Sequence, residues 1–285
     1  SLGRWLALKD PDWINPHYLT SHGLLAILVR SLFRLRAQLV ASAWGSDVLL
    51  APQRGRLQKI LLKWILSNSA LATSDSRHMA QKMHHLGAHE VMVFPFGLDA
   101  MPVESTKDNL LFFSNRGLEP IYNPFRVLKI FESIVHYWPN ARLVVANSGT
   151  LFDQMREWVD RNSLSHCIEF VGRLSPDVQA RYYAEARWFI SVPVSDAVSV
   201  SVLEAMAHGC LPILSDLPAN HELVGDPING RVLPDGKWDV RDFLLKDEMQ
   251  LNQLSTFNRK WVKDHALFGP AMERFLVRLS ELKKS

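Results

Sequence analysis

Two carboxylates lie eight positions apart in the second half of the chain, at Asp196 and Glu204. Asp196 precedes a short run of small and β-branched residues, and Glu204 lies in a compact apolar segment that ends at Gly209. This pattern predicts one acid in a loop and the other in the first turn of a helix. The first N–H groups of a helix have no partner within it and favour anions. We therefore expect both acids to face a ligand held at that helix N-terminus.

The same stretch resembles the signature of a known enzyme family. After Asp196-x7-Glu204 comes Ala-Met-Ala-His-Gly-Cys-Leu-Pro, ending at Pro212. This is similar to the retaining nucleotide-sugar glycosyltransferases of GT-B architecture, in particular their family four (group 1 glycosyltransferases), whose signature reads E-x7-E followed by A-M-A-x-G-x-P. The chain departs from it by an Asp at the first position and by one extra residue before the proline. The resemblance extends from about Asp12 to the C-terminus.

By this resemblance, Glu204 accepts hydrogen bonds from the ribose hydroxyls of a sugar-nucleotide donor, because a carboxylate offers two acceptor oxygens to a vicinal diol. Asp196 contacts the hydroxyls of the donor sugar. The N–H and hydroxyl groups of Ser199, Val200 and Ser201 face the diphosphate. Each assignment has a local alternative: a capping box between Ser201 and Glu204, a solvated loop position for Asp196, and plain N-capping by the serines.

A second cluster follows the strand that opens the predicted donor domain, at positions 113–116. The family has an Arg there and a Lys-Gly pair further on, and the two cations neutralise the diphosphate as it departs. By resemblance, Arg116 and Ser114 belong to the donor site, but Tyr122 and Asn123 occupy the place of Lys-Gly. Tyr122 or Asn123 would hydrogen-bond a phosphate without adding charge. The alternative for Arg116 is a surface arginine at a strand end.

The segment 170–174 is similar to the family's F-x-G-x-L, whose backbone usually contacts the nucleobase. Gly172 would permit close approach of the base, and Arg173 is assigned to the donor site with it. The alternative is a strand followed by a turn glycine.

On the acceptor side, the segment 43–47 resembles a loop written H-G-x-D in many relatives, which faces the cleft between the domains. Trp44 stands where the His is expected, which leaves Asp47 as a candidate hydrogen-bond partner or base. A helix N-cap or turn is the alternative for Asp47. His17 and His22 are the other histidines that we consider for this side.

The elements that must position these residues alternate between strands and helices. In the first third, strands are expected at 37–43, 71–73 and 91–94, and helices at 24–35, 57–66 and 76–86. Pro and Gly at 95–99 predict a hinge between domains. Beyond it, strands are expected at 110–114, 141–146, 168–171 and 188–192, and helices at 125–137, 151–162 and 176–184. This order is typical of doubly wound parallel sheets.

We therefore predict an α/β protein of GT-B type with two Rossmann-like domains. Residues 1–103 would form an acceptor-side domain. It is thin for a complete lobe, so it is either truncated or a minimal version of that domain. Residues 104–262 would form the donor domain, and 263–285 a helix that returns to the first domain, as the family suggests.

Composition narrows the class of protein. The chain has 285 residues, of which 47% are hydrophobic and 21% charged, as in ordinary globular proteins. Its two cysteines cannot form a disulfide framework, which favours a reducing, cytoplasmic location. We expect no membrane-spanning segment, because no apolar run is long enough to cross a bilayer, and no signal peptide. We also expect no cofactor and no metal, since the histidines near position 85 have no Cys or carboxylate beside them.

Charge is distributed unevenly along the chain. The first 64 residues hold nine Lys and Arg against three Asp and Glu. Such an excess attracts anionic partners, but it lacks the aromatic interleaving that single-stranded nucleic acid favours. We expect no nucleic acid as a partner. Either a peripheral contact with the anionic inner face of a membrane or an anionic acceptor would account for the excess. The alternative is ordinary amphipathic helices that pack on the sheet.

The predicted activity is retaining transfer of a hexose from a nucleotide diphosphate sugar to a saccharide or lipid-linked acceptor, in cell-surface polysaccharide synthesis. Front-face departure of the diphosphate is favoured by resemblance, with Arg and a helix N-terminus in place of a metal. A non-catalytic nucleotide-sugar-binding or partner subunit is the alternative, because the Lys and the loop His are replaced. A nucleotide-sugar-dependent epimerase is a third reading.

Overall fold

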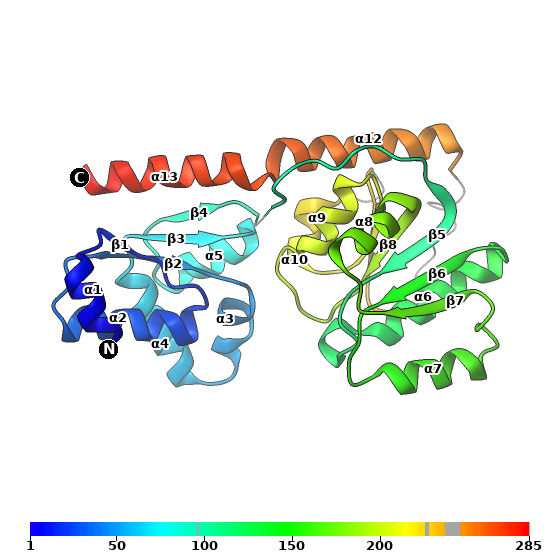
Figure 1. The fold of residues 1–285 in the computed structure, drawn as a ribbon. Coiled ribbons are helices and arrows are strands. Elements are labelled where there is room, and N and C mark those ends of the chain that lie inside the picture. Colours follow the sequence, from blue (N-terminus) through cyan, green and yellow to red (C-terminus); the bar gives the residue numbers. More distant parts are fainter. Residues whose placement is uncertain (96, 226–227, 237–245, 285) are drawn as a thin grey trace. The chain divides into compact units, whose positions relative to one another are not determined.

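The computed structural model describes residues 1–95, 97–225, 228–236 and 246–284. Contacts divide the chain into two compact units: unit 1 comprises Ser1–Phe96 with Phe268–Ser285, and unit 2 comprises Gly97–Leu267. Each unit contains a parallel sheet with helices on its two faces (Figure 1). The predicted α/β class is therefore confirmed.

The sheet of unit 1 has four described strands in the order β1-β2-β3-β4, all parallel. They are β1 (Trp13–Ile14), β2 (Gln38–Ser42), β3 (Leu71–Ser74) and β4 (Val91–Val93). Successive side chains of a strand point to opposite faces. Leu39 and Ala41 accordingly belong to one apolar cluster and Val40 to another. Both faces of the sheet are therefore buried, as expected of a parallel sheet.

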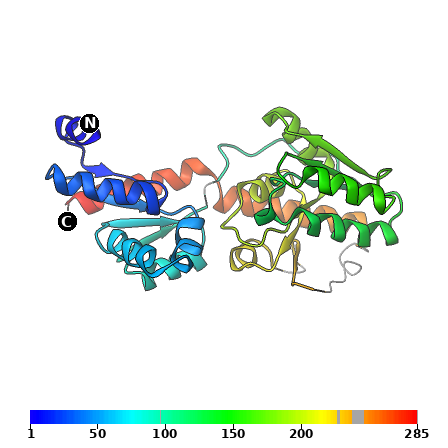
Figure 2. The ribbon, with the colours of Figure 1, turned by 90° about the horizontal axis from the view of Figure 1, so that it is seen from below.

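The helices of unit 1 complete these two clusters. They are α1 (Leu2–Lys9), the π-helix η1 (Leu19–Gly23), α2 (Leu24–Leu32), α3 (Ser46–Leu49), the 3-10 helix η2 (Ala51–Gln53), α4 (Arg56–Ser67), α5 (Arg77–His85) and α13 (Phe268–Lys284). Side chains of α2, α4 and α5 join the cluster of Leu39, and α13 covers the other face. Figure 2 looks onto the side of α2 and α4, with α13 behind. Helix α2 ends before the predicted residue 35 because Arg34 has a left-handed backbone (φ 51°).

Three contacts fix α13 on unit 1. Phe275 packs on Phe94 with ring centroids 6.1 Å apart. Arg278 Nε donates to Glu90 Oε1 at 2.6 Å, and Lys283 donates to the carboxylate of Asp12 at 2.6 Å. The end of the chain thus belongs to the first unit, where the family resemblance places it.

The sheet of unit 2 has six described strands in the order β10-β9-β8-β5-β6-β7. They are β5 (Asp108–Ser114), β6 (Arg142–Ala146), β7 (Ile168–Gly172), β8 (Ala186–Ser191), β9 (Leu211–Ser215) and β10 (Arg231–Leu233). The chain lays down β5, β6 and β7 in one direction, returns to pair β8 with β5, and then continues the other way. This is the doubly wound order, and its switch point lies between β5 and β8.

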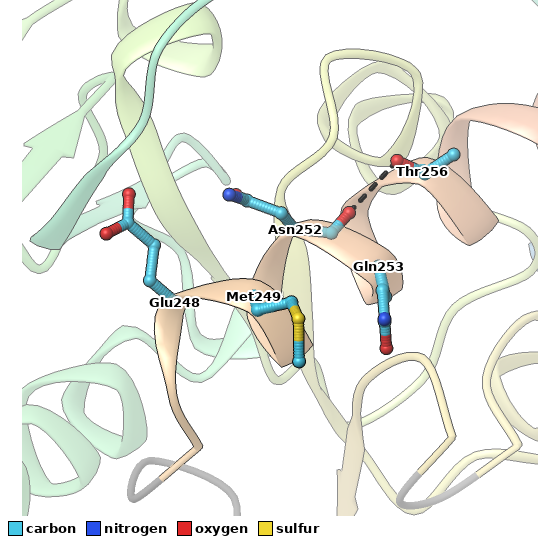
Figure 3. Close-up of a pocket in the computed structure, with 5 residues that line it drawn as sticks. All are labelled: Glu248, Met249, Asn252, Gln253 and Thr256. Carbon is cyan, nitrogen blue, oxygen red and sulfur yellow. Dashed lines mark hydrogen bonds between the residues drawn. The ribbon is translucent and has the colours of Figure 1, made fainter.

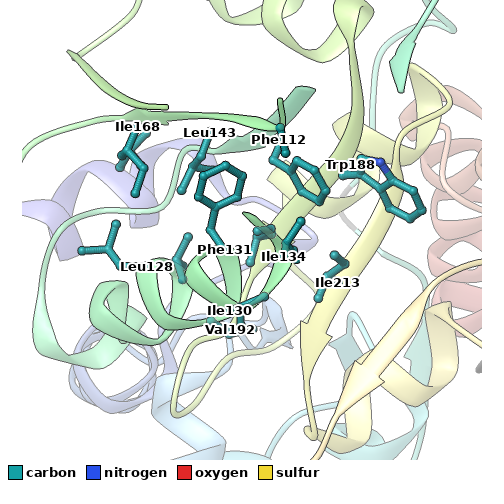
Figure 4. Close-up of a cluster of buried hydrophobic side chains, with 14 of the residues drawn as sticks. Phe112, Leu128, Ile130, Phe131, Ile134, Leu143, Ile168, Trp188, Val192 and Ile213 are labelled. Atoms are coloured by element: carbon teal, nitrogen blue, oxygen red, sulfur yellow. The ribbon is translucent and has the colours of Figure 1, made fainter. Parts of the chain in front are cut away.

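Alternate residues of β5 divide the core of unit 2 into two layers. Phe112 packs with Phe131 and Trp188 beneath α6 (Pro124–Tyr137) and α7 (Phe152–Arg161), as Figure 4 shows in part. Phe113 and Leu111 face the other layer, with α8 (Pro176–Glu185) and α9 (Val200–Ala207). The smaller helices η3 (Pro120–Tyr122) and α10 (Pro218–Leu223) follow β5 and β9.

Helix α12 (Glu248–His265) is absent from the sequence prediction. It begins with a capping box in which Asp247 and Gln250 bond each other's backbone N–H groups. Two of its buried positions are polar, Ser255 and Asn258. Those two residues interrupt the apolar period that would have predicted a helix.

The observed division of the chain differs from the predicted boundaries after residues 103 and 262. It falls at Gly97 and Leu267, because the start of unit 2 is bonded to α12 and its end. Leu98 N–H donates to the carbonyl of Ala266 at 3.0 Å, and Arg259 donates to the carbonyl of Pro102 at 2.9 Å. A side chain at Gly97 would collide with the backbone of Ala266. Phe96, within the predicted hinge, lies outside the described residues.

Candidate active site

The switch point of unit 2 brings together segments that are far apart in the sequence. Strand β5 ends at Ser114, two residues before Arg116. The neighbouring strand β8 ends at Ser191 and leads through the loop of Asp196 into α9. Carboxyl ends of parallel strands share one edge, and open α/β sheets bind ligands there at the switch point. The fold thus places the two predicted clusters side by side.

Arg116 is the centre of this site. Its Nη2 donates to Asp196 Oδ2 at 2.6 Å. Its Nη1 donates to Ser201 Oγ at 3.0 Å and also to the hydroxyl of Ser199, the N-cap residue of α9. One guanidinium therefore joins three residues predicted for the donor site. It adds a full positive charge beside the partial positive charge of a helix N-terminus.

Asp196 is a partly buried ion-pair partner, and the alternative of a solvated loop residue does not hold. Its side chain is 23% exposed, and that of Arg116 is 15% exposed. Burial raises the pKa of Asp196, and the charge of Arg116 opposes that rise. The Ala197 N–H also donates to Asp196 Oδ1 at 3.0 Å. The carboxylate is thereby held in one orientation, and it holds Arg116 in turn.

Glu204 points toward α8 and takes no part in a capping box. Its Oε2 accepts from the Tyr183 hydroxyl at 3.0 Å and from Gln179 Nε2 at 3.4 Å. Asn115 Nδ2 donates to the same Tyr183 hydroxyl at 2.7 Å. Burial raises the pKa of Glu204, and the Tyr183 hydrogen bond opposes that rise. Since α9 begins at Val200, the alternative capping box between Ser201 and Glu204 does not form. Glu204 is the fifth residue of the helix and lies in its second turn rather than in the predicted first turn.

Tyr183, Asn115 and Gln179 belong to this site but are absent from the sequence prediction. Asn115 lies inside the 113–116 segment, next to Arg116. Tyr183 and Gln179 share one face of α8 at the i, i+4 spacing, which is also typical of core-facing residues. The sequence gives no sign of their link to Glu204.

Tyr122 fills the place of the expected lysine. Its ring lies under the Arg116 guanidinium, 4.6 Å from centroid to Cζ. Asn123 has a left-handed backbone (φ 50°) and forms the N-cap position of α6. The second cation of the family's clamp is thus replaced by an aromatic face that supports the first.

The predicted base-contacting segment lies at the end of β7. Gly172 has a positive φ of 67°, and its carbonyl accepts from Asn147 N–H at 2.6 Å. Arg173 Nε donates to Ser148 Oγ at 2.9 Å. Ser114 is buried at the end of β5. Glycine is suited to this turn, so the segment also fits the alternative of a strand followed by a turn glycine. Contact with a nucleobase stays a prediction.

Asp47 in unit 1 is a structural acceptor. Its Oδ2 accepts from the Leu19 N–H at 2.9 Å, and its Oδ1 accepts from the Trp44 N–H at 3.0 Å. The residue is only 2% exposed. These bonds favour the turn role over that of an acceptor-side base, which stays untested.

The other acceptor-side candidates form an aromatic cluster. Trp44 Nε1–H donates to His17 Nδ1 at 2.9 Å, so a neutral His17 ring carries its proton on Nε2. Tyr18 stacks on Trp44 with centroids 5.7 Å apart. Burial and the nearby His22 lower the pKa of His17. His22 Nδ1 bonds the carbonyl of His17.

Two cavities of unit 2 lie away from these residues. One of about 600 Å³ follows α12 and is lined by Glu248, Met249, Asn252, Gln253 and Thr256 (Figure 3). Another of about 480 Å³ includes Arg187 and Gly209, at the amino ends of β8 and β9. Both are therefore separate from the switch-point site. Among the residues that the structure describes, no group of three or more His, Cys, Asp or Glu side chains is arranged to hold a metal ion.

The chain belongs to the group 1 glycosyltransferase family. Residues 99–261, more than half of the chain, match the family model "Glycosyl transferases group 1". Residues 2–76 match the model "Glycosyl transferase 4-like". The predicted membership is confirmed.

Curated relatives match short stretches of the chain. Over 120 residues it is 28% identical to alpha-monoglucosyldiacylglycerol synthase of Streptococcus pneumoniae. The matched stretch covers 42% of this chain and 27% of that protein. Over 124 residues it is 25% identical to the uncharacterized glycosyltransferase MJ1607 of Methanocaldococcus jannaschii, which covers 38% of this chain and 31% of that protein. The matched part thus spans less than a third of each relative.

Solved structures match almost the whole chain. HepE from Anabaena, crystallised with UDP-glucose, superposes with a TM-score of 0.79 at 13% identity and covers 98% of this chain and 82% of its own. Sucrose-phosphate synthase from Thermosynechococcus elongatus gives a TM-score of 0.81 at 16% identity and covers 100% and 77%. At such identities the likeness concerns the fold, and it confirms the predicted GT-B class.

Proposed function

We propose that this chain carries a retaining glycosyltransferase activity, in which a hexose moves from a nucleotide diphosphate sugar to a saccharide or lipid-linked acceptor. The observation that carries the proposal is Arg116, bonded to Asp196 and to both serines at the start of α9. Family membership supplies the reaction class.

In this proposal the diphosphate lies against the N-terminus of α9. The N–H groups of its first turn and the Arg116 guanidinium are charge-complementary to it. Negative charge grows on the diphosphate as the bond to the sugar breaks. Fixed donors aimed at that charge lower the barrier to its departure.

Glu204 is assigned to the ribose. The bonds that described residues make with its carboxylate go to Oε2, so we assign Oε1 to a ribose hydroxyl. Asp196 is assigned to positioning Arg116 and to a sugar hydroxyl. In the proposed front-face step, the acceptor oxygen bonds the anomeric carbon on the side from which the diphosphate leaves. The acceptor proton passes to the departing diphosphate.

The relatives suggest which substrates to test first. The pneumococcal relative is named for a glucosylated diacylglycerol, and HepE was crystallised with UDP-glucose. We accordingly put UDP sugars and lipid acceptors at the head of the panel. A cytoplasmic location and a role in cell-surface polysaccharide synthesis stay predictions.

The test is a thermal-shift and calorimetric screen against UDP, GDP, ADP and dTDP, followed by hydrolysis of the matching sugar nucleotides. We expect Arg116→Ala to weaken nucleoside diphosphate binding by about tenfold or more, because a charge-assisted hydrogen bond contributes roughly 1.5–3 kcal/mol. Arg142→Ala is the matched control, since Arg142 forms an exposed ion pair with Asp108 at the opposite edge of the sheet. If both variants bind the nucleoside diphosphate equally well, the diphosphate does not bind at this site.

A binding subunit without turnover is the second candidate. It is favoured by Tyr122, which stands on Arg116 where a second cation is expected. Tight diphosphate binding together with no hydrolysis or transfer of any sugar would support it.

A further inference from the structure

Helix α4 has an apolar stripe that faces solvent. Leu57, Ile60 and Trp64 follow the spacing i, i+3, i+7 and are all exposed. Such a spacing places them on one side of a helix. The opposite side carries Leu62, Ile65 and Leu66, which are buried in the core of unit 1. One side of α4 thus covers the sheet, and the exposed apolar stripe lies on the other side and is not needed for that packing.

Helix α2 repeats this arrangement. Leu25, Leu28 and Leu32 have the same i, i+3, i+7 spacing and are exposed, whereas Ala26 and Ile27 are buried. Helices α2 and α4 contact each other and lie on one face of the sheet of unit 1 (Figures 1 and 2). Large exposed apolar patches are uncommon on soluble proteins and mark interaction sites.

The charge around these stripes has one sign. Residues 24–67 contain seven Lys and Arg and a single acid, Asp47. Asp47 is buried and accepts two backbone N–H groups, so it does not offset the surface charge. The exposed cations are Arg34, Arg36, Arg54, Arg56, Lys59 and Lys63. Three of them belong to α4 itself.

An occupant of this surface must be apolar and anionic together. A second copy of the same surface would bring like charges into contact, which is unfavourable. No helix of the described residues is long and apolar enough to cross a membrane. A helix with exposed Leu, Ile and Trp beside Lys and Arg is suited to the interface of an anionic bilayer, with its apolar side chains among the acyl chains.

We propose that the outer sides of α2 and α4 form a membrane-docking surface for anionic lipid bilayers. Leu28, Leu32, Ile60 and Trp64 insert at the boundary between the headgroups and the acyl chains, and the cations of α4 contact lipid phosphates. The surface determines where the protein works, and it does not depend on the donor chemistry assigned to unit 2.

The test is flotation of the full chain with phosphatidylcholine vesicles and with vesicles that also contain phosphatidylglycerol. We expect binding to the second kind only, weakening as salt screens the attraction. Ile60→Glu should lower partitioning by about tenfold or more, because an inserted apolar side chain is replaced by a charge. Lys59→Glu should lower it by roughly fivefold or more, since each cation near an anionic surface contributes about 1 kcal/mol.

Two controls separate docking from general damage. Leu276 on α13 is 60% exposed, close to the 64% of Ile60, so Leu276→Glu should bind vesicles as the parent chain does. Lys263→Glu on α12 is the control for charge. Circular dichroism and melting should be unchanged in every variant, because all four positions are exposed.

Equal binding to both kinds of vesicle, or full binding by Ile60→Glu and Lys59→Glu, would overturn the proposal. A dimer that Ile60→Glu dissociates, seen by light scattering in the absence of vesicles, would overturn it in favour of self-association. Donor hydrolysis measured in parallel keeps the two proposals apart, since these variants should hydrolyse sugar nucleotide at the parent rate.

Discussion

At the scale of single residues, the proposed donor site depends on how one guanidinium is shared. Arg116 bonds one carboxylate and two hydroxyls and stacks on Tyr122. A guanidinium presents its N–H donors in a fixed planar fork and stacks on an aromatic face, whereas the ammonium of lysine is a compact charge without that geometry. We infer that Arg116 organises the loop before α9, in addition to the donor contact that we propose for it.

Glu204 gives a prediction of activity and stability at this scale. Glu204→Gln should lower turnover by about a hundredfold or more, because an amide binds a diol less well than a carboxylate does. Its stability at neutral pH should equal or exceed that of the parent chain. Burial raises the pKa of Glu204, so the parent chain loses stability as pH rises through that pKa, and the variant does not.

Urea unfolding at several pH values measures this difference. The stability advantage of Glu204→Gln should shrink as pH falls through the raised pKa, where the parent carboxyl is protonated. An advantage that grows toward low pH would contradict the assignment. Glu169→Gln is the control, since its carboxyl is exposed on β7.

At the scale of elements, a buried acid connects two segments of unit 1. Asp47 in α3 bonds Leu19 at the start of η1 and Trp44 in the preceding loop. The ring of Trp44 in turn bonds His17. The backbone that carries the Trp44 ring is therefore held by a buried carboxylate.

Asp47→Asn is the prediction at this scale. The amide of Asn has one acceptor oxygen where the carboxylate of Asp has two, so one of the two backbone N–H donors loses its partner. The variant should therefore lose about 1–3 kcal/mol of stability. Denaturant unfolding measures the loss. Asp10→Asn on the exposed end of α1 is the control. If Asp47→Asn keeps full stability but loses turnover, Asp47 acts in the chemistry instead.

At the scale of the whole molecule, each unit has its own apolar core. Clusters in unit 1 include α13 from the end of the chain, whereas unit 2 is continuous in sequence. Units with separate cores can unfold in separate steps. The last helix is thus a stability element of the unit that begins the chain.

Phe275→Ala is the prediction at this scale. It removes a buried ring that packs on Phe94, which typically costs about 3–5 kcal/mol. Scanning calorimetry should show one transition moved to lower temperature while the other, assigned by nucleoside diphosphate stabilisation to unit 2, stays in place. Loss of both transitions together would show that the units unfold as one. Leu276→Ala, next along the helix and exposed, is the control.

The sequence by itself determined the alternation of strands and helices, the helix start after Asp196 and the family. These depend on local spacing: apolar periods, turn residues and a signature within about thirty positions. It also placed Asp196 in a loop and Glu204 in a helix, because the immediate neighbours of each residue specify both. The apolar pattern did not predict helix α12, because two of its buried positions, Ser255 and Asn258, are polar.

The tertiary structure alone decided which side chains meet. Arg116 reaches Asp196 across 80 positions of sequence, Tyr183 reaches Glu204, and Trp44 reaches His17. It also decided that two apolar stripes of α2 and α4 face solvent, although their sequences suit burial equally well. The physical reason is twofold. The order of the strands brings distant segments to one edge of the sheet. An apolar period in the sequence indicates that a helix has an apolar face, but it does not indicate what covers that face.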